Sequence, residues 1–159
     1  MCICRLLFTD LNSNPWWHRN LGRRSFRVLF TVENQGCWRG ENFKMVDGVL
    51  FDKEMTRLVW CSPKKGEYEI PHTVKTIDSM SFQLCYKLTS IAISDSVTEI
   101  PSHAFRGCYG LEKVIIPRSV VSIGVKAFAL CFRLMTISVP EGLEYPPTTF
   151  PLCARIIRY

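Results

Sequence analysis

The amino-acid sequence predicts an α/β repeat solenoid: a short stack of parallel β-strands joined by short helical turns, with a β-hairpin as its N-terminal cap. Three observations predict this fold. The C-terminal part of the chain divides into four lines of 23 residues, apolar residues recur in the same columns of these lines, and a turn signal flanked by two apolar runs precedes the first line. One repeat of this size cannot bury its own apolar edge, so we expect neighbouring repeats to stack.

The four lines justify the stack. Six columns carry apolar residues, and they are Ile70/Ile93/Ile116/Val139, Val74/Val97/Val120/Leu143, Ile77/Ile100/Ile123, Phe82/Phe105/Phe128/Phe150, Cys85/Cys108/Cys131/Cys153 and Leu88/Leu111/Leu134/Ile156. The last line lacks one residue between Leu143 and Phe150, which shifts its later columns by one. We therefore predict about four rungs over residues 68–159, the last one degenerate, with a ladder of Phe side chains in the core.

The order of apolar residues within one line predicts its local structure. Residues 91–93 alternate between inward and outward positions, which is typical of a half-buried strand. Val97 and Ile100 then point inward at a spacing of three, and Pro101 opens a short helical turn that carries Phe105 into the core. Because every line repeats this order, the strands should form a parallel sheet along one face.

Residues 43–67 predict the cap. Asp47-Gly48 is a turn signal, and apolar runs flank the polar stretch Asp52–Arg57, which predicts short antiparallel strands. Such a hairpin can cover the open edge of the first rung. Residues 1–42 form an N-terminal tail for which the sequence predicts no definite structure.

The charge of the chain does not favour a nucleic-acid partner. The net charge is +6, but residues 68–159 hold nine basic and seven acidic residues, residues 1–42 hold six Arg against three acids, and the basic excess is spread thinly along the chain. A solvated tail explains this distribution better than a surface that follows phosphates. No run of eighteen apolar residues predicts a transmembrane helix, and no signal peptide is evident at the start.

The repeat also resembles a known family. The run I-x-I-P-x-x-V-x-x-I-x-x-x-A-F-x-x-C-x-x-L is similar to the BspA-like leucine-rich repeat, and residues 114–134 match it nearly throughout. Residues 91–111 carry Ser94 in place of the proline, and residues 68–88 carry Ser81 in place of the alanine. The segment at 43–67 is similar to the hairpin that often leads into such repeats.

The resemblance implies a leucine-rich-repeat stack and a role in binding. Members of this family are often exposed on the cell surface or secreted, and some act as adhesins. We therefore expect a non-catalytic protein-binding repeat protein, of a cell-surface, adhesin-like kind. The alternatives are an intracellular interaction scaffold, or a fragment of a longer surface repeat protein.

The eight cysteines allow two interpretations. A cysteine that recurs once per repeat behaves as a small buried apolar residue, and a redox role is the alternative. The remaining four show no such order, and Cys2-x-Cys4 lacks the spacing of a zinc site; they are Cys2, Cys4, Cys37 and Cys61. We expect no metal site and no cofactor.

No residues present a catalytic pattern. His72 and His103 lie between core columns, and no spacing joins them or His18 to a nucleophile. A short solenoid also lacks the deep pocket that most catalysis needs. The sequence therefore predicts no catalytic residues.

The outward positions of the predicted strands are the candidate binding site. They are mostly small and uncharged, which suits a protein chain or an extended peptide. The predicted site residues are Glu67, Glu69, Ser90, Ala92, Lys113, Ile115, Thr136 and Ser138. The alternative is that they form only a solvated face.

Overall fold

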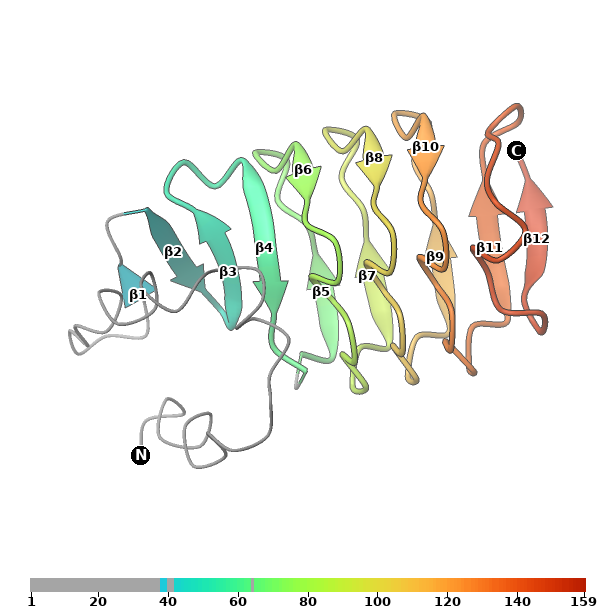
Figure 1. Cartoon of the computed structure of the whole chain (residues 1–159), viewed down its shortest axis with the longest axis horizontal. Helices are drawn as coiled ribbons and strands as arrows, with labels where there is room; N and C mark the ends of the chain where they lie inside the picture. Colours follow the sequence, from blue (N-terminus) through green and yellow to red (C-terminus); the bar gives the residue numbers. More distant parts are fainter. Residues whose placement is uncertain (1–37, 40–41, 64) are drawn as a thin grey trace.

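The computed structural model describes residues 38–39, 42–63 and 65–159. Its strands stack side by side along one long axis (Figure 1), with β2 to β4 towards one end and β12 at the other. The predicted tail at residues 1–42 lies outside the described part, apart from residues 38–39 and 42. The fold is thus a β-solenoid, as the repeat predicted.

Antiparallel strands lead into the solenoid. Their bounds are β1 (Trp38–Arg39), β2 (Phe43–Val46), β3 (Val49–Asp52) and β4 (Arg57–Cys61). Asp47 and Gly48, both at positive φ, form the tight turn between β2 and β3. At the next turn, the Asp52 carboxylate accepts hydrogen bonds of 2.7 and 2.9 Å from the backbone amides of Thr56 and Arg57. β4 is antiparallel to β3 but parallel to β6, so it joins the hairpin to the stack. The division at residues 43 and 68 stays a prediction.

Two rows of parallel strands form the stack itself. The longer sheet contains β5 (Glu67–Glu69), β7 (Ser90–Ala92), β9 (Lys113–Ile115), β11 (Thr136–Val139) and β12 (Arg155–Arg158). The second row consists of β6 (Thr76–Ile77), β8 (Glu99–Ile100) and β10 (Ser122–Ile123). β6 pairs with β4 and β8 pairs with β10. The core lies between the two rows.

Phenylalanine side chains run through this core as a ladder. Phe82 and Phe105 have ring centroids 4.9 Å apart, Phe105 and Phe128 are also 4.9 Å apart, and Phe150 follows at 5.5 Å from Phe128. The first three rings are completely buried. The predicted Ile, Val and Leu columns are buried around them through the complete repeats. The core columns of these repeats are therefore confirmed.

The predicted helical turns are wrong for the described residues, which contain no helix. Each segment that should have been helical contains two residues in the left-handed region, four positions apart: Met80 and Leu84, His103 and Gly107, Lys126 and Leu130. Alternate backbone amides of this segment donate to the next rung, and those between them donate within their own turn. Phe105 N–H donates to Ala127 O at 2.8 Å, as Phe82 N–H donates to Ala104 O at 2.9 Å. A helix would have needed these amides for itself.

The last line also departs from its predicted columns. Ile156 pairs with Ile137 in the sheet and is 39% exposed, so it does not continue the Leu134 column. Cys153 is exposed and lies near Leu134, with its sulfur 4.0 Å from Leu134 O. Cys61 is buried and takes the position that Phe82 and Phe105 have in later rungs. Its N–H donates to Ser81 O and its carbonyl accepts from the Cys85 thiol, so Cys61 lies outside the cysteine column, as its irregular spacing predicted. The stack thus begins one rung earlier and ends with a strand that was not predicted.

The Phe ladder leads to a first prediction. Phe105 is 0% exposed and stacks on both neighbours, so Phe105→Ala leaves a cavity that the rigid rungs cannot close. We expect a loss of about 3–5 kcal/mol in the free energy of unfolding, measured by urea denaturation of the purified protein. A variant that keeps its unfolding midpoint would contradict the register described here.

Ser81 leads to a second prediction. It stands where the next rungs have Ala104 and Ala127, and its buried hydroxyl has no hydrogen-bond partner in the described part of the chain. Ser81→Ala removes an unpaired polar group and should raise the free energy of unfolding by about 1 kcal/mol. Ser119→Ala is the matched control, because the Ser119 hydroxyl donates to Val97 O at 2.8 Å and its loss should destabilise. Equal effects of the two substitutions would be inconsistent with this explanation.

Candidate functional site

The eight predicted site residues lie together on the outer face of the longer sheet. Strand register aligns them in two rows across β5, β7, β9 and β11. One row is Glu67, Ser90, Lys113 and Thr136, and the other is Glu69, Ala92, Ile115 and Ser138. The residue between the rows on each strand points the other way: Ile91, Val114 and Ile137 are buried, and Tyr68 is partly buried. This sheet face, defined by the two rows, is a continuous surface.

β12 extends both rows by one strand. Arg155 pairs with Thr136, and Ile157 pairs with Ser138. Both side chains are exposed. Sequence reasoning missed them because the last repeat is shorter than 23 residues, which placed its end in the wrong columns. The residues of β12, Arg155-Ile156-Ile157-Arg158, show no apolar–polar alternation that could have revealed the strand.

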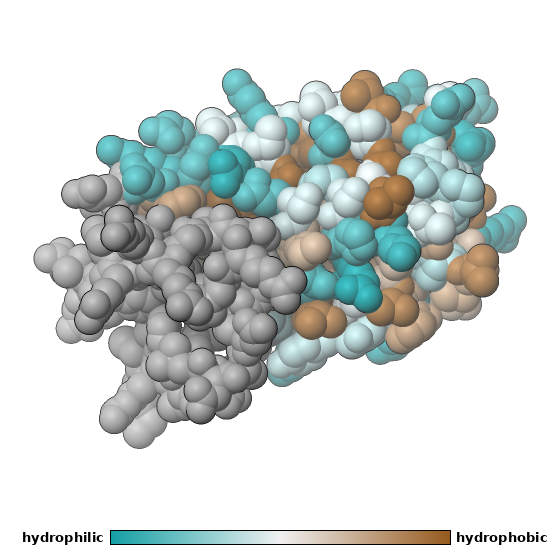
Figure 2. Space-filling model, in the orientation of Figure 1, coloured by the Kyte–Doolittle hydropathy of each residue, from teal (hydrophilic) through white to brown (hydrophobic). Residues whose placement is uncertain are grey.

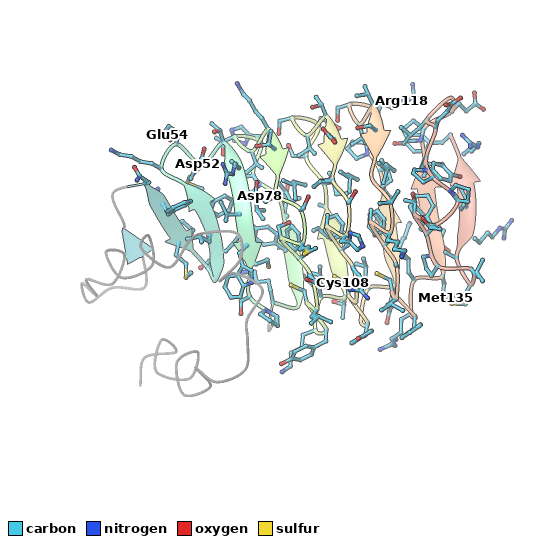
Figure 3. The ribbon with its side chains drawn as sticks, viewed as in Figure 1. Asp52, Glu54, Asp78, Cys108, Arg118 and Met135 are labelled. Atoms are coloured by element: carbon cyan, nitrogen blue, oxygen red, sulfur yellow. The ribbon has the colours of Figure 1, made fainter. Side chains whose placement is uncertain are left out.

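Two open hollows lie over the sheet face. The larger, of about 800 Å³, covers β7 and β9 and is lined by four predicted residues, Ser90, Ala92, Lys113 and Ile115. The smaller, of about 510 Å³, lies beside it over Glu69 and Ala92. Residues from the turns that follow the strands complete the two linings; they include His72, Asp95, Arg118 and Tyr159. Figure 3 shows Arg118 at the edge of the stack where these turns lie.

Tyr159 closes one side of the larger hollow. Its hydroxyl donates to Ile116 O at 2.7 Å, and the Arg118 guanidinium lies over its ring, 5.5 Å from the centroid. The backbone supports this position, because Tyr159 N–H donates to Val139 O at 3.1 Å and Glu141 N–H donates to Tyr159 O at 3.0 Å. The ring is thus held across the rungs, a contact between residues 43 positions apart that no local pattern could indicate.

The sheet face combines an exposed apolar side chain with charged neighbours. Ile115 is 51% exposed, and Lys113, Arg118 and Asp95 line the same hollow. An exposed apolar group within a polar border is typical of a protein-binding patch. No group of three or more His, Cys, Asp or Glu side chains that could hold a metal ion occurs among the described residues. No described helix is long and apolar enough to span a membrane.

The cysteine column Cys85, Cys108 and Cys131 is a ladder of buried thiols. Cys108 Sγ donates to Phe82 O at 3.1 Å, and Cys131 Sγ donates to Phe105 O at 3.1 Å, one rung further on. Hydrogen bonding to the Cys131 thiol and burial raise the pKa of Cys108. Hydrogen bonding to Cys61 and burial do the same for the pKa of Cys85. Because the thiolate is the reactive form, these groups serve as packing rather than as nucleophiles.

The fold is a leucine-rich-repeat solenoid. Its strands stack in register, each core position of the repeat forms one column, and one face of the sheet is open. The chain belongs to the BspA type leucine rich repeat family: the sequence model of that repeat region matches residues 60–155, in six copies. The match therefore covers most of the repeats and ends at Arg155, the first residue of β12. No curated protein matches the sequence.

Solved bacterial leucine-rich-repeat proteins share the fold. A leucine rich cell surface protein from Faecalibacterium prausnitzii A2-165 is 24% identical over 76% of this chain and 40% of its own, with a TM-score of 0.62. A leucine-rich repeat protein from Bacteroides ovatus ATCC 8483 is 26% identical over 82% of this chain and 41% of its own, with a TM-score of 0.59. A third, from Eubacterium ventriosum ATCC 27560, is 25% identical over 75% and 40% of the two chains, with a TM-score of 0.61. This chain spans about two fifths of each of these relatives.

The thiol ladder leads to a third prediction. In the folded protein at mildly alkaline pH, iodoacetamide should modify Cys153 about a hundredfold faster than Cys108, because only Cys153 is exposed and Cys108 must wait for unfolding. Peptide mass spectrometry over time measures both rates, and denaturant should make them similar. Equally fast modification of Cys108 in the folded protein would rule out a purely structural ladder.

Proposed function

We propose that this chain is a non-catalytic binding module that uses its sheet face to hold an extended segment of a partner protein. The observation that carries the proposal is the pair of side-chain rows across five strands, centred on an exposed Ile115 and deepened by the larger hollow. A partner in extended conformation can place alternate side chains along such rows. The eight predicted residues, with Arg155 and Ile157, would make the contacts.

The mixed charges of the face support a protein partner over a uniformly charged polymer. Glu67 and Glu69 lie at one end of the rows, Lys113 lies near the middle, and Arg155 lies at the other end. A nucleic acid would meet repulsion from the two glutamates. Opposite charges at the two ends would instead select the direction of a bound peptide.

We further propose that the module acts at the cell surface, in adhesion. The support is family membership and the likeness in fold to a leucine rich cell surface protein. The alternative, an intracellular interaction scaffold, is favoured by one observation: five described cysteines are free thiols, which a reducing compartment maintains. Under the surface hypothesis, the chain would form part of a longer repeat array, since it spans about two fifths of its solved relatives.

Location can be tested on intact source cells with an antibody against residues 68–159. Under the surface hypothesis, external protease removes the antibody signal while a cytosolic control protein survives. A signal that persists until the cells are lysed would overturn that hypothesis and leave the intracellular scaffold.

The binding surface leads to a fourth prediction. A phage-displayed library of linear peptides, selected on the purified protein, should yield clones that lose about tenfold or more in affinity for Ile115→Asp, because the charge meets an apolar contact. The circular dichroism spectrum of the variant should not change, since Ile115 is 51% exposed. Val121→Asp, at a site that is 75% exposed and off the sheet face, is the matched control and should bind normally. Clones that bind the wild type, Ile115→Asp and Val121→Asp equally well would show that the binding site is not at Ile115.

A further inference from the structure

A second surface, away from the sheet face, carries exposed apolar side chains in repeat register. It lies on the turns that lead into the strands of the longer sheet, and Figure 1 shows these turns as a row of loops along the lower margin. We call it the aromatic edge and define it by Leu84, Tyr86, Tyr109, Leu130 and Phe132. Their exposed fractions lie between 39% and 64%.

The aromatic edge is a continuous strip and not a scatter of single residues. The rings of Tyr109 and Phe132 stack at 5.7 Å with an interplanar angle of 4°. Gly107, at φ +75°, lies beneath the Leu84 side chain and beside the Tyr109 ring, so any Cβ at that position would collide with Leu84. Leu84 can thus lie across the neighbouring rung towards Tyr109. Figure 2 shows apolar residues recurring along this margin of the molecule.

Burial in the stack does not account for these side chains. The core columns before and after them, Cys108 and Leu111 for instance, are completely buried, whereas Tyr109 between them is exposed. Three successive rungs nevertheless place an aromatic residue at this one position, as Tyr86, Tyr109 and Phe132. A repeated exposed aromatic position marks an interaction surface.

Charge is distributed unequally between this edge and the opposite one. The described turns of the aromatic edge hold three cations, Lys65, Lys87 and Arg133, and one acid, Glu112. The turns that follow the strands, on the opposite edge, hold three acids and two cations; they are Asp95, Glu141 and Glu144, with Lys75 and Arg118. Lys87 directly follows Tyr86, and Arg133 directly follows Phe132 and forms an ion pair of 2.9 Å with the exposed Glu112. The apolar strip therefore coincides with the more basic edge.

We propose that the aromatic edge binds the surface of a lipid bilayer that contains anionic lipids. Tyr and Phe side chains on projecting turns can enter the interfacial region, where a hydroxyl stays hydrated and the ring does not. Adjacent Lys and Arg side chains reach the phosphates with their charged ends. Tyr109 and Phe132 cover one face of each other's ring, which leaves less ring surface for a sugar or a base to stack on.

The test is flotation of the full chain with vesicles of phosphatidylcholine and phosphatidylglycerol in equal amounts. We expect binding to these vesicles, weaker binding to pure phosphatidylcholine, and a fall with added salt. The double variant Tyr109→Ser/Phe132→Ser should bind about tenfold more weakly, because two interfacial side chains are lost. Both positions are exposed, and an unchanged melting curve would verify that the variant folds.

Two controls locate the effect. Val121→Ser/Val125→Ser removes two apolar side chains that are 75% and 45% exposed but lie outside the aromatic edge, and this variant should bind like the wild type. Ile115→Asp should also bind vesicles normally, so the membrane proposal and the sheet-face proposal can fail separately. Absent vesicle binding, or binding that the edge variant keeps in full, would overturn the proposal. Edge-dependent binding of a poly-glutamate peptide without vesicle binding would overturn it in favour of an acidic protein partner.

Discussion

The rest of this structure depends on the stacking of each rung's core on its neighbour. Phe105 contacts Phe82 on one side and Phe128 on the other at the same centroid distance of 4.9 Å. No rung covers its own ring, so a rung is stable only between two others. This requirement fixes the spacing of the rungs, which in turn fixes the spacing of everything on the surface. The rows on the sheet face and the stacked pair on the aromatic edge therefore both have the spacing of the rungs.

Backbone hydrogen bonds follow the same requirement. In a helix, the amides of residues 102–107 would have bonded within their own turn. Here Phe105 and Gly107 donate to Ala127 and Ala129 of the next rung, and left-handed residues such as His103 turn the intervening amides into place. The segment therefore gives up local helical bonds for bonds between rungs. The same arrangement leaves Cys108 Sγ beside Phe82 O of the previous rung, to which the thiol donates a hydrogen bond.

The core columns could be predicted from the sequence because each buried position requires an apolar residue in every complete rung. Ile77, Ile100 and Ile123 are equivalent for this reason alone. The predictions failed where the structure depends on contacts with another rung instead of on the local sequence. Helical turns were predicted from a proline and a polar residue, while the competing bonds came from the next rung. Strand β12 was missed because the 23-residue period fails before it, and the earlier start of the stack was missed because Cys61 stands where later rungs have Phe. The sheet-face positions followed from alternation, whereas Tyr159 reaches Ile116 through a contact that no periodicity encodes.

The repeat contains two kinds of position: buried positions, where the core requires an apolar residue, and exposed positions, where it does not. Strand residues alternate strictly, so Ile91 must be apolar but Ala92 and Ser90 need not be. Ile115 in that free position is then a choice that costs solvation and gains nothing within the stack. The exposed position of Tyr86, Tyr109 and Phe132 is free in the same sense, yet three rungs fill it alike. The sheet face and the aromatic edge lie on different sides of one rigid stack, so a partner on one would leave the other accessible. A repeat this short can therefore offer two independent contacts while relying on a single core.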